Sequence, residues 1–151
     1  MDYQAVRSKF ESSLNTAYGA LSPAIPVYFD NTLNTISDAE SEFIHVNLQF
    51  GATTEQTLST VFDYIQGTIV IRAFTEKGKG PARNQTLIST AVSELRSLSN
   101  TAKASTGVYV RIGPITGPSF GTGSTAQESR VSFTPYFISR IDTTFTAQVI
   151  S

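Results

Sequence analysis

The sequence LSTVFDYIQGTIVIRAF, residues 58–74, is a long β-rich stretch on which the interpretation of the whole chain depends. After Gly67, which is expected to mark a bulge or a bend, Ile69 and Ile71 lie on one face of the strand and Val70 lies on the other. Apolar groups also occupy both faces before the glycine. An antiparallel strand of this kind needs two coverings. The protein's own helices can supply one, and another subunit can supply the second.

A half-buried strand is predicted immediately upstream, over residues 42–50 (EFIHVNLQF). Apolar residues take every second position in it, at Ile44, Val46, Leu48 and Phe50. This period of two is typical of a strand with one buried face. A short extended piece is expected at 26–31, and residues 51–57 are expected to form a polar connector.

Two amphipathic helices are predicted, over residues 2–21 and 81–100, and both are expected to pack on the sheet. Apolar residues recur in the first at Val6, Phe10, Leu14, Ala17 and Leu21. They recur in the second at Leu87, Ile88, Ala91, Val92, Leu95 and Leu98. Spacings of three and four residues place each set on one helical face.

The C-terminal third is predicted to hold a strand at 107–113 and another at 129–141, with a tail at 142–151 that could add a final strand or an arm. Between the strands, residues 114–128 (PITGPSFGTGSTAQE) are rich in Gly, Pro, Ser and Thr. A segment of this composition has no core of its own. We therefore expect a long loop that is disordered or ordered by a partner.

The order of elements predicts the fold class. The chain of 151 residues has the length of a single domain, and no internal repeat or linker divides it. Runs of strands bracketed by helices favour an α+β fold, with a mixed, largely antiparallel β-sheet flanked by two α-helices, over a doubly wound fold.

Residue counts exclude most catalytic and metal sites. Cysteine is absent, which excludes disulfides, thiolate nucleophiles and cysteine-based metal sites. His45 is the only histidine, and it is expected to be an exposed or interface residue. The acidic run Asp38, Glu40 and Glu42 lacks the spacing of a calcium loop and is expected to be solvated. We therefore predict that the protein is not an enzyme and binds no cofactor or metal.

A glycine-rich turn before the second helix, within GKGPARNQT, invites comparison with phosphate-binding loops. It lacks both established glycine-lysine patterns, and Pro81 removes one backbone donor. Lys77, Lys79 and Arg83 are therefore expected to be solvated. A net charge of −1 also argues against a dedicated nucleic-acid binder.

The longest apolar runs are far shorter than the roughly 20 residues that span a bilayer, and the N-terminus (MDYQAVRSKF) has no apolar signal region. No membrane association is expected, and the protein should remain in the cytoplasm in which it is made.

The chain resembles the tail terminator proteins of long-tailed bacteriophages over nearly its whole length. The resemblance rests on six stretches: SPAIPVYFDN, FIHVNLQFG, DYIQGTIVIRAF, TEKGKGPARNQTLISTAVSEL, VYVRIGPITGPSF and RVSFTPYFISR. The sequence departs from the pattern at Phe29, where tryptophan is expected, and after Arg140, where the closing stretch is longer than usual.

The resemblance implies a virion structural protein of the tail and neck, assembled in the host cytoplasm. It implies a homo-oligomer, a hexameric ring that caps the tail tube, stops its polymerisation and offers a docking surface to the head-tail connector. The ring would touch the tail tube protein, the connector or neck protein and, in a contractile tail, the sheath protein. Genomic DNA would pass through the lumen without specific binding, and near-neutral walls suit that passage.

Candidate contact residues follow from the tendency of interface energy to concentrate in aromatic residues and arginine. Phe62, Tyr64 and Arg72 are the candidates for subunit contacts. The candidates for docking to the tube or connector lie in the segment 114–128: Ile115, Pro118, Phe120, Gly121 and Gly123.

Two other functions stay open. A head-tail connector or stopper protein of the neck would also form a ring and would differ only in its partner. A small-ligand-binding or enzymatic α+β domain belongs to a different class, and it would be a monomer or dimer with a concave polar pocket.

Overall fold

A computed structural model of the chain describes residues 3–21, 24–29, 42–55, 62–76, 81–100, 107–123 and 136–150. The helices are α1 (Tyr3–Gly19) and α2 (Ala82–Ser99). The strands are β1 (Val27–Tyr28), β2 (Phe43–Glu55), β3 (Phe62–Glu76), β4 (Gly107–Ile112), β5 (Thr116–Gly123) and β6 (Tyr136–Ile150).

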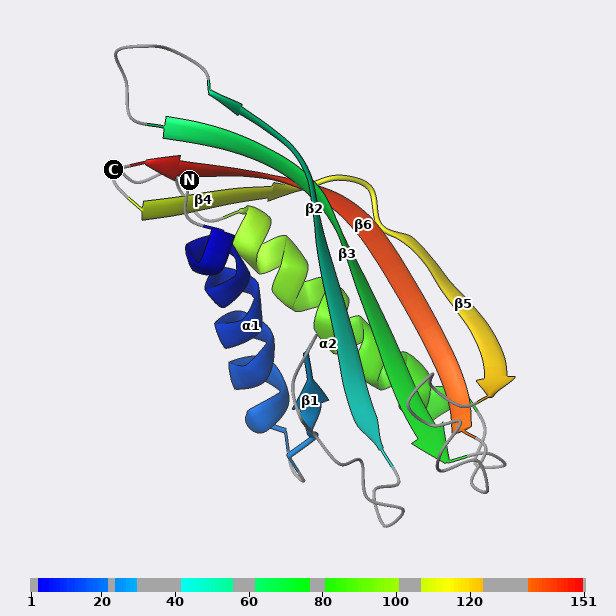
Figure 1. Cartoon of the computed structure of the whole chain (residues 1–151). Coiled ribbons are helices and arrows are strands. Elements are labelled where there is room, and N and C mark those ends of the chain that lie inside the picture. Colours follow the sequence, from blue (N-terminus) through cyan, green and yellow to red (C-terminus); the bar gives the residue numbers. More distant parts are fainter. Residues whose placement is uncertain are drawn as a thin grey trace.

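The strands form one curled six-stranded sheet in the order β1-β2-β3-β6-β4, and β5 also pairs with β6 (Figure 1). Only β1 and β2 are parallel to each other, and every other pair is antiparallel. Both helices lie beneath the same side of the sheet. We call this side the inner face and the opposite side the outer face. The predicted α+β class, with a mixed, largely antiparallel sheet and two helices, is confirmed.

The core lies between the inner face and the helices. Register fixes which residues share that face: Val46 pairs with Ile71, and Ile71 pairs with Ile141. The predicted apolar stripe of α1 supplies Val6, Phe10 and Leu14, joined by Tyr18. The stripe of α2 supplies Leu87, Ile88, Ala91, Leu95 and Leu98. The period of each element thus decides which side chains are buried.

Asn84 ties the start of α2 to the sheet by polar contacts inside the core. Its fully buried amide nitrogen donates to the carbonyl oxygens of Ala73 at 3.0 Å and Phe137 at 2.9 Å. Its Oδ1 accepts a hydrogen bond from the hydroxyl of Ser139. A buried amide is tolerated because its donors and its acceptor all have partners. This cluster holds the first turn of α2 against β3 and β6.

A second buried cluster occupies one end of the outer face. Phe43 and Phe74 are register partners whose rings stack with centroids 4.4 Å apart. Tyr136 packs edge-on against both, and Tyr28 and Ile138 pack around them. At this end of the outer face, residues of the same chain therefore contact one another without any second subunit.

Three sequence-based boundaries were wrong. Residues 51–55, expected as a connector, continue β2, and residues 116–123, expected as part of a loop, form β5. The last strand and the tail are one element, since β6 continues to Ile150. The cause is tertiary: β5 contains glycine, proline and hydroxyl residues with little strand propensity, yet they pair with β6. Residues 124–128 of the expected loop lie outside the described residues.

The expected irregularity near Gly67 lies on the neighbouring strand instead. Gly67 itself sits in regular register with Phe50 and Phe145, whereas β2 shifts register between Phe50 and Thr53. The extra residue is therefore in β2, and it sharpens the bend of the sheet at this point.

Candidate functional site

The charged residues predicted to be solvated are partly tied into the structure. Glu42 accepts two hydrogen bonds from the Nε of Arg83, both 3.0 Å long. This contact with Glu42 raises the pKa of Arg83 above its ordinary value. The Arg83 side chain is still 38% exposed, as the sequence predicts, and its guanidinium also links the start of α2 to the start of β2. Asp38, Glu40, Lys77 and Lys79 lie outside the described residues.

Little in the described part of the chain is arranged for catalysis. His45 is half-buried on the outer face. Among residues 3–21, 24–29, 42–55, 62–76, 81–100, 107–123 and 136–150, no three His, Cys, Asp or Glu side chains are grouped to hold a metal ion. Neither of the two helices in these ranges is long and apolar enough to cross a membrane.

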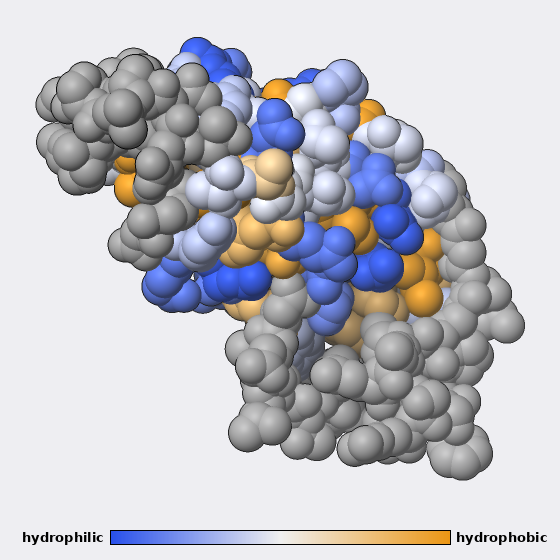
Figure 2. Space-filling view, turned by 45° about the horizontal axis from the view of Figure 1, so that its top comes forward, coloured by the Kyte–Doolittle hydropathy of each residue, from blue (hydrophilic) through white to orange (hydrophobic). Residues whose placement is uncertain are grey.

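Two of the three predicted subunit-contact residues share one surface. Tyr64 and Arg72 lie on β3 at outer-face positions, and both are half-buried. Phe62 pairs with Ile150 in the ladder between β3 and β6, and its side chain lies outside the described part of the structure. Figure 2 shows the molecule with its top turned forward, where hydrophobic residues form separate patches among hydrophilic ones. Neither of the two described helices covers this outer face.

The predicted docking residues do not form one flexible loop. Ile115 is half-buried and packs against the main core, and its docking role stays a prediction. Pro118 is exposed on β5. Phe120, Gly121 and Gly123 take ladder positions opposite Ser139, Ile138 and Tyr136 of β6; of the Phe120 side chain the structure describes nothing.

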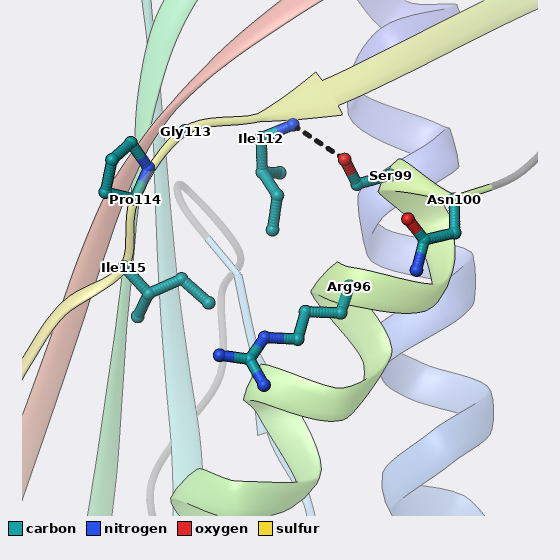
Figure 3. A pocket seen from close by; sticks show the side chains of 7 residues that line it. All are labelled: Arg96, Ser99, Asn100, Ile112, Gly113, Pro114 and Ile115. Carbon is teal, nitrogen blue, oxygen red and sulfur yellow. Dashed lines mark hydrogen bonds between the residues drawn. The ribbon is translucent and has the colours of Figure 1, made fainter.

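The extended chain is interrupted at residues 113–115, between β4 and β5, and this break lies beside the C-terminal end of α2. Arg96 and Ser99 of α2 and the following Asn100 line a hollow of about 250 Å³ there, together with residues 112–115 (Figure 3). The hydroxyl of Thr143 donates towards the carbonyl oxygens of Gly113 and Pro114, at 3.0 and 3.1 Å. The break is thus held by β6 on one side and lies against the helix on the other.

One edge of the sheet is covered. The amide of Ile44 donates to the carbonyl of Pro26 at 2.9 Å, so even-numbered residues of β2 in this region turn their backbone groups away from β3. Further along, Arg7 of α1 donates to the carbonyl of Leu48 at 3.2 Å. The strand β1 and the helix α1 therefore protect this part of the edge.

The opposite edge is open along β4. The amide of Gly113 donates to the carbonyl of Thr144 at 2.8 Å. Because bonding residues alternate in an antiparallel pair, Val108, Val110 and Ile112 turn their backbone groups away from β6. Ile112 donates to the hydroxyl of Ser99 at 3.2 Å. Within the described residues, no partner takes the amide or carbonyl groups of Val108 and Val110.

Sequence reasoning missed this open edge. Local alternation predicts that residues 107–113 form a strand, but it does not say that the strand lies at the margin of the sheet. That position follows only from the pairing of β6 with both β3 and β4.

Comparison with known proteins bears on the fold. No family model matches the sequence, and no curated protein matches it. Several solved chains match, and one of them has a TM-score of 0.61 and 21% sequence identity, over 100% of this chain and 99% of the other. At this identity the likeness shows a shared fold, and fold by itself does not assign function.

Proposed function

We propose that the chain is a virion structural protein, a tail terminator that forms a hexameric ring on the tail tube of a long-tailed bacteriophage. The ring stops tube polymerisation and provides the docking surface for the head-tail connector. The observation that carries the proposal is the outer face of the sheet, which no described helix covers and on which Tyr64 and Arg72 lie half-buried. Tyrosine and arginine are the residue types that most often anchor protein interfaces.

The sequence resemblance supports this function independently, since it covers nearly the whole chain. The surface chemistry agrees with it. The chain has a net charge of −1 and only 15% charged residues, which suits a ring through which DNA must pass without being retained. On the outer face, Arg140 is paired with Asp142 at 3.2 Å, so part of its positive charge is balanced within the chain.

A small-ligand-binding function has weaker support. The hollow beside Arg96 measures about 250 Å³, below the roughly 300–1,000 Å³ of typical ligand sites. The larger groove between α1 and α2 is open and lined mainly by alanine, serine and threonine side chains with Lys9 and Glu94. Glu94 accepts a hydrogen bond from Ser13 in that groove.

Two measurements test the proposal. Light scattering and native mass spectrometry of the purified chain should give the mass of six protomers, and phage particles that lack the chain should carry tails of uncontrolled length in electron micrographs. Normal tails in its absence would refute the function. Pull-down against purified tube protein and against portal-adaptor complexes distinguishes a terminator from a connector or stopper, because only a terminator binds the tube end.

A further inference from the structure

We propose that the open edge of β4 pairs with the distal edge of β2, residues 52–55, in a neighbouring copy of this chain, so that the sheets of adjacent subunits become continuous. The proposal rests on the ring function above and names the contact that closes the ring.

The first step concerns backbone groups of β4 that have no partner in the part of the chain that the structure describes. Val108 and Val110 direct their amide and carbonyl groups to the open side of β4. Exposed strand edges are normally blunted by proline, by lysine or by a covering element. β5 has Pro118, and the proximal part of β2 has β1 and Arg7. Residues 107–110 contain neither proline nor lysine, which leaves this edge fit to accept another strand.

The second step concerns the opposite margin. Beyond the bulge, β2 pairs with β3 through Thr53, Thr54 and Glu55. Thr53 is the register partner of the buried Ile65, and its hydroxyl forms a hydrogen bond of 2.7 Å with that of Tyr3 on the helix side of the sheet. No described backbone group pairs with residues 52–55 on the side away from β3. Among the described residues, a second edge of similar length without a backbone partner therefore lies across the sheet from β4.

The third step concerns position. Thr54 pairs with Tyr64, Tyr64 with Gln148, and Gln148 with Tyr109. These four residues form one row that runs from the β2 edge to the β4 edge, at the end of the sheet that lies uppermost in Figure 1. A contact between opposite edges of identical copies is heterologous, and such contacts build rings when the rotation closes. Pairing of β4 with β4 would instead stop at a dimer.

The geometry also predicts different roles for Tyr64 and Arg72, two of the candidate contact residues. Tyr64 lies one strand from the β2 edge, within about 10 Å of a strand added there. Arg72 lies eight positions further along β3, roughly 26 Å away. Tyr64 should therefore contribute to the contact between edges, whereas Arg72 should not.

Cysteine trapping tests the contact directly, because the chain has no cysteine of its own. Tyr109→Cys and Thr54→Cys are made as separate variants and then mixed under oxidising conditions at millimolar protein concentration. A disulfide-linked dimer is expected from the mixture, with the yield from either variant alone at least tenfold lower. The matched control is Thr68→Cys, which replaces a residue near the middle of β3, mixed with Tyr109→Cys; it should give no linked dimer.

Each other outcome overturns the inference. Linkage of Tyr109→Cys alone would show that β4 pairs with β4. Six-protomer rings without linkage in the mixture would remove the proposed contact while leaving the terminator function intact. A chain that stays monomeric and unlinked at millimolar concentration would also overturn it, and tail length in particles lacking the chain then decides the function separately.

A second pair of variants tests the contribution of the backbone amide of Val108 to the contact. Val108→Pro removes an amide that points to the open side and leaves the ladder with β6 in place, whereas Val108→Ala keeps that amide. The proline variant should raise the protein concentration at which half of the chains are assembled by at least about tenfold. The alanine variant should raise that concentration less than threefold. If both variants keep the circular dichroism spectrum of the natural chain and change this concentration equally, the proposed strand pairing is contradicted.

Discussion

The ring of Phe145 lies directly over Gly67, its register partner on the neighbouring strand. A β-carbon at position 67 would stand 2.5 Å from the Cζ of Phe145 and 2.5 Å from the carbonyl oxygen of Gln49. The absent side chain lets the phenyl ring reach Phe10 of α1, with centroids 5.0 Å apart. Glycine at this position therefore connects the bend of the sheet to the packing of the first helix.

Replacing this glycine should be costly. Gly67→Ala is expected to lower the free energy of unfolding by about 2–4 kcal/mol, because the ring or the backbone must move to admit the methyl group. Urea unfolding measures the change. Gly19→Ala is the matched control: a β-carbon there meets nothing within 4 Å, so stability should hold or rise by up to about 1 kcal/mol. A loss at position 67 no larger than at position 19 would disprove the steric account.

Removing the buried amide of Asn84 should also destabilise the fold. In Asn84→Ala the carbonyl groups of Ala73 and Phe137 and the hydroxyl of Ser139 lose their shared partner. Each buried polar group left unsatisfied costs about 1–3 kcal/mol, so a total of about 3 kcal/mol is expected in urea unfolding. The exposed neighbour provides the control, since Gln85→Ala should change stability by less than about 0.5 kcal/mol. Similar losses in both variants would contradict the role of Asn84.

Tyr18 should give the fold a dependence on alkaline pH. Burial raises the pKa of its phenol above the ordinary value of 10.0, although a backbone hydrogen bond with Ala91 opposes this in part. Above about pH 10 the unfolded chain loses this proton while the folded chain keeps it, so the unfolded state binds fewer protons and stability falls as pH rises. The contribution is fully present below that pH.

The variant Tyr18→Phe isolates this effect. At about pH 8 it should be less stable than the natural chain by about 1 kcal/mol, because it lacks the hydrogen bond of 2.7 Å to the carbonyl of Leu87. At about pH 11 the difference should vanish or reverse, since one pH unit is worth about 1.4 kcal/mol. Urea unfolding at both pH values provides the test, and a constant difference between the two proteins would refute it.

Tyr64 should matter for assembly rather than for folding. Tyr64→Ala is expected to leave the circular dichroism spectrum unchanged and to weaken subunit association by about 1–2 kcal/mol, the usual cost of truncating an interface aromatic. Native mass spectrometry over a dilution series measures it. Gln66→Ala, at an exposed position on the same face two residues away, is the control. Unchanged association of Tyr64→Ala would remove this residue from the interface.

Periodicity determined much of the fold in advance. A stripe such as Val6, Phe10 and Leu14 can be buried only if the segment is helical, and the alternation from Ile44 to Phe50 can be buried only if it is extended. The α+β class follows from the order of these elements. The candidate surface was predictable in part: alternation along residues 58–74 places Tyr64 and Arg72 on one side of a strand.

The remainder depended on contacts between residues distant in sequence. Nothing local to residues 116–123 predicts a strand, because their order comes from the ladder with β6. Local sequence also does not show that Ile115 packs partly against the main core, because that contact forms only in the folded chain. The tertiary structure also brings Arg83 of α2 into a salt bridge with Glu42, which directly precedes β2.

The sequence by itself determined which segments are helices and strands, which face of each is buried, and that thiol chemistry and paired imidazoles are absent, because side-chain type and spacing are local properties. Only the tertiary structure decided that β4 lies at an open edge and that Thr54, Tyr64, Gln148 and Tyr109 share one row. Strand order and register are set by pairing between distant segments, and no local pattern encodes which strand is left without a neighbour.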